Sequence, residues 1–119
     1  MSDESTLDTT AIARLRKLGG DKFVGDMIDL FFQYVPERLA AARVAAQAGD
    51  LQAVEKAVHS LKSSAGQIGA CRVQDLATQI EKLAVDKQAD AIRLLLPQLE
   101  ESLTQVKPLL EGQRNPPPS

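Results

Sequence analysis

The only histidine of this 119-residue chain, His59, lies on the polar side of a segment with helical spacing. Apolar residues recur there at the i, i+3, i+4, i+7 positions of one buried stripe. They are Leu51, Val54, Val58, Leu61, Ala65 and Ile68. At about 100° per residue, His59 points about 140° away from the centre of this stripe. We therefore expect an imidazole that faces solvent, whose neutral form can offer a nitrogen lone pair near neutral pH.

Three further residues share the outward face of this helix with the histidine: Lys62, Ser63 and Gly66. Side chains one or two turns apart on one face are neighbours. The imidazole thus has an ammonium group beside it and little bulk on its C-terminal side. Gly66 costs the helix about 1 kcal/mol relative to alanine, which indicates that space at this point matters.

The next helical segment offers a carboxylate, Glu81, at the level of His59. Both residues lie eleven positions from Ala70, where the chain is expected to turn. At about 1.5 Å per residue, both sit about 16 Å from that turn in an antiparallel hairpin. Glu81 projects about 105° from the centre of its own apolar stripe, so it can reach the imidazole. A carboxylate that accepts the Nδ1 proton would leave Nε2 free to attack.

This segment resembles the signature of histidine-containing phosphotransfer (HPt) domains. The motif reads His59-Ser60-Leu61-Lys62-Ser63-Ser64-Ala65-Gly66, followed by Gly69-Ala70. The flanks also match in order: Leu7-Asp8, Gly19-Gly20-Asp21, Gly49-Asp50, Leu76-Ala77 and Ile80-Glu81. Ser63 departs from the pattern, since the family most often has glycine after the lysine. Serine is also small, so we expect tighter partner docking rather than loss of function.

The resemblance implies a phosphocarrier in a multistep two-component phosphorelay. His59 would accept a phosphoryl group from the phospho-aspartate of a receiver domain in a hybrid sensor kinase and pass it to a response-regulator aspartate. Lys62 would lie near the phosphoryl oxygens, and Glu81 would orient the ring. Docking residues would be Ser63, Gly66, Gln67 and Phe32. The divalent metal would sit on the partner, so we expect no cofactor and no metal site in this chain.

Other interpretations stay open from the sequence. A helical adaptor could bind a receiver domain without accepting phosphate. Glu81 could be a plain solvated charge, Lys62 could pair only with Glu55 or Asp50, and Phe32 could be a core-edge residue. A metal site at His59 lacks further ligands. No ATP-site pattern is present, so we expect neither an autokinase nor another enzyme.

The elements that position these residues are all helical. We expect a short helix over about 8–18, stopped by Gly19-Gly20, and helices over about 21–48, 51–68, 72–86 and 88–110. Pro36 predicts a kink or short break near residues 33–35, and Pro97 a bend. No segment alternates as a strand does. The fold class is therefore all-α, an antiparallel up-down-up-down four-helix bundle with a short N-terminal capping helix.

Length and composition are those of one domain. We expect a flexible N-terminus over residues 1–7, the HPt bundle over 8–111 and a disordered, proline-rich tail over 112–119. The net charge of −2 does not indicate nucleic-acid binding. No apolar segment is long enough for a signal or a membrane span, and the single Cys71 cannot form an internal disulfide. A cytoplasmic protein is expected, and the resemblance implies a monomer.

Overall fold

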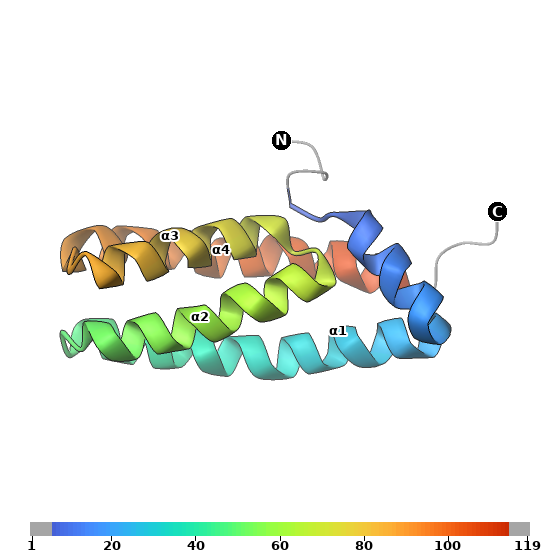
Figure 1. The fold of residues 1–119 in the computed structure, drawn as a ribbon, viewed down its shortest axis with the longest axis horizontal. Helices are drawn as coiled ribbons and strands as arrows, with labels where there is room; N and C mark the ends of the chain where they lie inside the picture. Colours follow the sequence, from blue (N-terminus) through green and yellow to red (C-terminus); the bar gives the residue numbers. More distant parts are fainter. Residues whose placement is uncertain (1–5, 115–119) are drawn as a thin grey trace.

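The computed structural model describes residues 6–114, which form four helices and no strand. The helices are α1 (Thr9–Gln47), α2 (Leu51–Ile68), α3 (Cys71–Val85) and α4 (Ala89–Arg114). Successive long helices run in opposite directions and lie side by side (Figure 1). The predicted all-α, antiparallel four-helix bundle is confirmed.

The first eleven residues of α1 form the predicted capping helix. The chain turns at Gly20, whose φ of 79° and ψ of −171° are the only non-helical dihedrals inside α1. The segment before this turn crosses the end of the bundle (blue in Figure 1). In this segment Ile12 and Leu15 are buried, whereas Leu18 is exposed. Each i, i+3 step falls about 60° short of a full turn, so Leu18 lies about 120° around the helix from Ile12.

The helix that carries the histidine begins and ends where its sequence predicts. At its start, Asp50 Oδ1 accepts a hydrogen bond from the Ala53 backbone N–H at 3.1 Å, which satisfies an unpaired donor of the first turn. At its end, Gly69 adopts a left-handed φ of 81°. That conformation suits glycine and lets α3 start two residues later, so the α2–α3 hairpin is tight.

The core is aliphatic and receives side chains from all four helices. Its largest fully buried members are Ile12, Ile28, Leu61, Ile68, Ile80, Ile92, Leu99 and Leu110. The apolar stripe of α2 faces this core, which leaves the opposite face of α2 to solvent. No helix within residues 6–114 combines the length and the apolar character needed to cross a bilayer.

Of the two outcomes predicted for Pro36, a kink or a short break near residues 33–35, the short break does not occur. Helical dihedrals continue through Pro36, and α4 likewise runs without interruption through Pro97 and Pro108. Pro36 is exposed. The carbonyl that loses its N–H partner to this proline can bond to water, so the missing hydrogen bond does not end the helix.

The described structure extends beyond the predicted bundle at both ends. Thr6 and Leu7, expected to be flexible, are buried. The helix α4 continues three residues into the predicted disordered tail and ends at Arg114. The guanidinium of Arg114 donates to the Gly25 carbonyl at 3.1 Å and pairs with Asp29 and Glu111, contacts that offset the low helix propensity of Gly112. Predictions for residues 1–5 and 115–119 lie outside the described residues.

Candidate functional site

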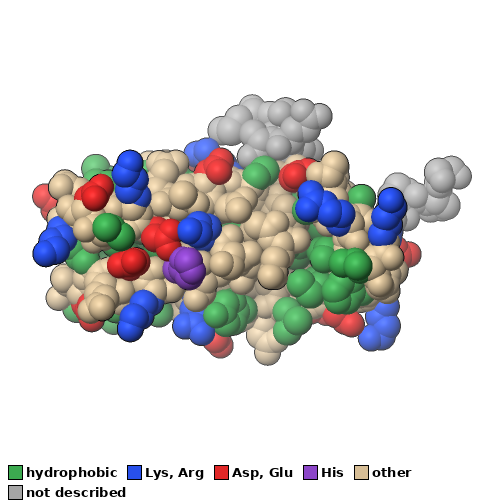
Figure 2. All heavy atoms as spheres, viewed as in Figure 1, with side chains coloured by type: hydrophobic (Ala, Val, Ile, Leu, Met, Phe, Trp, Pro, Cys, Tyr) green, Lys and Arg blue, Asp and Glu red, His purple; other side chains and the backbone are tan. Residues whose placement is uncertain are grey.

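The imidazole of His59 stands on the solvent face of α2. Its side chain is 63% exposed, and Nδ1 lies 2.5 Å from Glu81 Oε2 on α3. The predicted contact between these two residues across the hairpin is confirmed. In Figure 2 the purple histidine lies at the surface, bordered by acidic and basic side chains.

Glu81 also accepts a hydrogen bond from a cationic group. Lys62 Nζ donates to Glu81 Oε1 at 2.6 Å, so the two carboxylate oxygens serve two different residues. The hydrogen bond from Lys62, and then that from His59, lowers the pKa of Glu81 below its usual value against the opposing effect of burial. Glu81 is therefore ionised at neutral pH. Lys62 thus pairs with Glu81 and not with Glu55 or Asp50.

This contact determines which ring nitrogen is reactive. An ionised carboxylate only accepts hydrogen bonds, so Nδ1 carries the proton when it is bonded to Glu81. The neutral ring then has its lone pair on Nε2, for which the described residues provide no partner. The arrangement presents a nucleophilic nitrogen toward solvent, held in one tautomer by an acid.

The exposed face of α2 has two borders. Lys62 and Gly66 lie toward α3, while Ser64 and Gln67 lie toward α1. A Cβ on Gly66 would lie only 2.7 Å from Nε2 of Gln74 on α3. The space expected there for a partner is thus partly taken by the end of the Gln74 side chain, which is flexible and can move away. Ser63 is exposed between the two borders.

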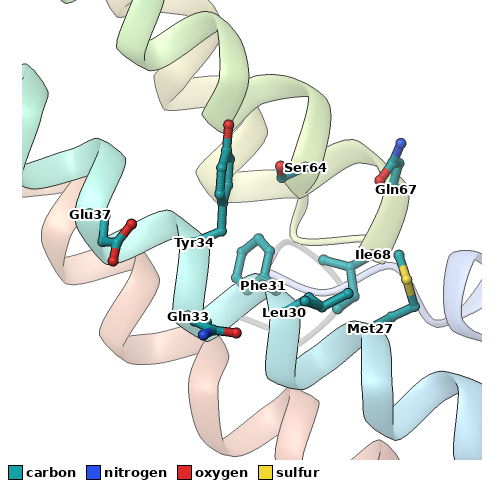
Figure 3. Close-up of a pocket in the computed structure, with 9 residues that line it drawn as sticks. All are labelled: Met27, Leu30, Phe31, Gln33, Tyr34, Glu37, Ser64, Gln67 and Ile68. Carbon is teal, nitrogen blue, oxygen red and sulfur yellow. The ribbon is translucent and has the colours of Figure 1, made fainter.

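A groove of about 470 Å³ lies along the border between α2 and α1. Its lining residues are Met27, Leu30, Phe31, Gln33, Tyr34 and Glu37 from α1, and Ser64, Gln67 and Ile68 from α2 (Figure 3). The sequence predicted Gln67 here and Phe32 on α1, but not the α1 residues that line the groove. The available signal was Leu30 and Tyr34, two large residues four positions apart that lie off the buried stripe.

Phe32, predicted as a docking residue, is not among the residues that line this groove. Its ring packs edge-on against Phe31 with centroids 5.1 Å apart, and Lys107 Nζ from α4 lies 5.7 Å from its centroid. Two residues along a helix correspond to about 200°, so Phe32 faces away from Leu30 and Tyr34. It is a core-edge residue.

Across residues 6–114, no three histidine, cysteine or acidic side chains are grouped as a metal site would require. His59 and Glu81 alone would leave a zinc ion short of protein ligands. The groups that the described residues bring together are an imidazole, a carboxylate and an ammonium group.

Comparison with known proteins identifies the family to which this chain belongs. The model of the Hpt domain family matches residues 26–108, a range that contains His59, Lys62 and Glu81. The chain belongs to the Hpt family. A search of curated proteins found no match.

A solved Hpt structure has the same fold. The crystal structure of histidine-containing phosphotransfer protein B (HptB) from Pseudomonas aeruginosa PAO1 matches with a TM-score of 0.86 and 28% sequence identity. The match covers 92% of this chain and 94% of that chain. As an Hpt domain, the present chain is a phosphocarrier rather than an enzyme, with a role in histidine phosphotransfer in two-component signalling.

Proposed function

We propose that this Hpt domain takes a phosphoryl group from a receiver-domain phospho-aspartate onto Nε2 of His59 and passes it to the aspartate of a response regulator. The observation that carries the proposal is the exposed imidazole whose Nδ1 is bonded to Glu81 at 2.5 Å. That contact leaves Nε2 as the ring nitrogen with a lone pair directed away from the bundle.

The transfer step uses groups already in place. The Nε2 lone pair forms a bond to phosphorus while the bond between phosphorus and the aspartyl oxygen breaks, and the electron pair leaves with the carboxylate. The ring becomes positively charged, and the ionised Glu81 on Nδ1–H offsets this charge. Transfer to the second aspartate is the same step in reverse.

The partner supplies what this chain lacks. Phosphoryl transfer depends mostly on positioning and charge stabilisation, and the receiver domain is proposed to bring the divalent ion and the acceptor aspartate. No cofactor of the chain itself is then required. Ser63, Gly66 and Gln67 lie on the same face as His59, and the groove beside Gln67 offers apolar surface for docking.

The decisive experiment is the His59→Gln variant. Purified receiver domains carrying labelled phosphate are mixed with the wild-type chain and with the variant, and both binding and label transfer are scored. We expect the variant to bind the cognate receiver as the wild type does but to take up no label. A labelled variant would place the phosphate on another residue.

The same experiment tests the rival adaptor function. A wild-type chain that binds phosphorylated receivers but never becomes labelled would be an adaptor and not a carrier. The label on a phosphocarrier should also be lost in acid and retained in base, because the phosphorus–nitrogen bond of phosphohistidine is acid-labile.

A further inference from the structure

Glu81 holds the nucleophile and its neighbouring cation at the same time. Its two oxygens lie 2.5 Å from His59 Nδ1 and 2.6 Å from Lys62 Nζ. The side chains of Glu81 and Lys62 are 18% and 29% exposed, against 63% for His59. Before phosphorylation, the lysine charge is therefore already engaged by a carboxylate and is partly shielded from solvent.

The two groups differ in their freedom to move. Nδ1 belongs to a rigid ring, and phosphorylation at Nε2 leaves its proton in place. The Lys62 ammonium ends a flexible four-carbon chain and can redirect its three donors. Since Lys62 lies three residues after His59 on the same helix face, a group on the ring is within its range.

A phosphoryl group would compete strongly with Glu81 for this ammonium. Protein-bound phosphoryl groups carry a charge of about −1.5 to −2 and three acceptor oxygens, whereas the carboxylate carries one charge and already accepts from His59. The larger charge and the three acceptor oxygens therefore favour the phosphoryl group as the partner of the lysine.

We propose that the Lys62 ammonium has two positions, on Glu81 in the resting protein and on a phosphoryl oxygen when His59 is phosphorylated. Glu81 is then a positioning residue that holds the lysine until the phosphoryl group arrives and recaptures it on transfer. This inference rests on the proposed function, in which His59 is the phosphorylated residue. Recapture by Glu81 favours release, which a carrier needs.

Lysine-selective NMR of the intact chain tests the two positions directly. The Lys62 ¹⁵Nζ signal is identified by its absence in Lys62→Gln, and the chain is loaded with phosphoramidate or with a phosphorylated receiver. We expect Nζ to contact the Glu81 carboxyl carbon before loading and to couple to ³¹P after it. If the ³¹P signal shows that phosphohistidine has formed but Lys62 keeps its contact with Glu81, the two-position inference is wrong. The proposed function is not affected by that result. Failure of both donors to produce phosphohistidine would overturn the proposed function as well.

A double-mutant cycle tests the consequence for transfer. The equilibrium ratio of phosphohistidine to receiver phospho-aspartate is measured for the wild type, Glu81→Gln, Lys62→Gln and the double variant. Forming phosphohistidine breaks the Lys62–Glu81 pair only in the wild type. We therefore expect Glu81→Gln to shift the ratio toward phosphohistidine more strongly when residue 62 is lysine than when it is glutamine. The difference between the two backgrounds should be about two- to fivefold, the range expected for one partly exposed ion pair.

The matched control replaces Lys56, an exposed lysine one turn before His59 for which no ion pair is found in the described structure. A cycle with Lys56→Gln in place of Lys62→Gln should show no coupling to Glu81. Equal effects of Glu81→Gln in both Lys62 backgrounds would mean that the lysine stays on Glu81 throughout, and the two-position proposal would fail.

Discussion

At the residue scale, the carboxylate of Glu81 contributes to the chemistry of the site but is not part of the apolar core that folds the bundle. Its contact with Nδ1 selects the tautomer and orients the ring, and neither function needs the apolar core. The loss of this side chain should therefore reduce transfer without unfolding the bundle.

Glu81→Ala is expected to slow phosphoryl transfer from a phosphorylated receiver by about ten- to a hundredfold, because a reacting group that is no longer held in position loses about that much. The measurement is the initial rate of labelling, with far-UV circular dichroism as the check on folding. Glu101→Ala, at an exposed position on α4, is the matched control and should transfer at the wild-type rate. A wild-type rate for Glu81→Ala would remove this residue from the site.

The lowered pKa of Glu81 makes its contribution to stability depend on pH. A depressed pKa in the folded state adds stability above the unfolded value of about 4.5, and this stability is lost as the pH falls through the folded value. We expect Glu81→Gln to lower the free energy of unfolding by about 1 kcal/mol or less at pH 7. The gap between the two proteins should close at acidic pH. Urea unfolding at several pH values measures it, and a constant difference would contradict an ionic origin.

At the scale of the elements, two glycine positions, Gly69 and Gly20, determine how the helices are arranged around the site. The α2–α3 turn at Gly69 sets the level at which His59 and Glu81 meet, and the break at Gly20 allows the capping helix to cross the bundle. The backbone N–H of Asp8 donates to the Gly69 carbonyl at 2.7 Å. The turn and the start of the capping helix are therefore packed together.

These two glycines should respond differently to alanine. Both have left-handed φ angles, but a Cβ on Gly69 would lie 2.4 Å from the Asp8 carbonyl oxygen, whereas a Cβ on Gly20 meets nothing within 4 Å. Gly20→Ala should cost about 1–3 kcal/mol from its dihedrals alone, because a φ of 79° with a ψ of −171° is essentially restricted to glycine. Gly69→Ala should cost about 1–3 kcal/mol more because of the clash.

The helical Gly112, which also has open space around it, completes the series. Gly112→Ala should leave stability unchanged or raise it by up to about 1 kcal/mol. Urea unfolding midpoints rank the three variants, and equal losses at Gly20 and Gly69 would show that the close contact with Asp8 does not form.

At the scale of the whole molecule, the reactive ring and the groove lie on one side of the bundle. Figure 2 shows apolar side chains on the same face as the histidine, and the groove joins α1 to α2 next to Gln67. A docking partner that covers this face would contact both α1 and α2.

Leu30→Glu should weaken binding to the cognate receiver by about tenfold or more, since it places a charge where apolar surface would be buried, a cost of about 1–3 kcal/mol. Leu30 is 57% exposed, so the fold should tolerate the change. Binding is measured by calorimetry, and labelling by phosphoramidate should stay at the wild-type rate.

The control for this variant is Leu94→Glu. Leu94 is an exposed leucine on α4 that is not among the groove-lining residues, so receiver binding should be unaffected. Equal losses for the two variants would argue against docking in the groove.

The sequence alone was sufficient for the features that depend on local order. Helical periodicity over residues 51–68 predicted α2 and its outward histidine. Counting residues on both sides of one tight turn placed Glu81 opposite His59. These predictions hold because the rise and rotation per residue of a helix are nearly constant over such short spans.

The tertiary structure decided the features that depend on how separate helices rotate against each other. The Lys62–Glu81 pair, the amide of Gln74 over Gly66, the inward packing of Phe32 and the groove between α1 and α2 all belong to this group. A helix with one apolar stripe can rotate by a few tens of degrees and still bury that stripe. Residues at the flanks of the stripe therefore acquire their neighbours only when all four helices pack around a common core.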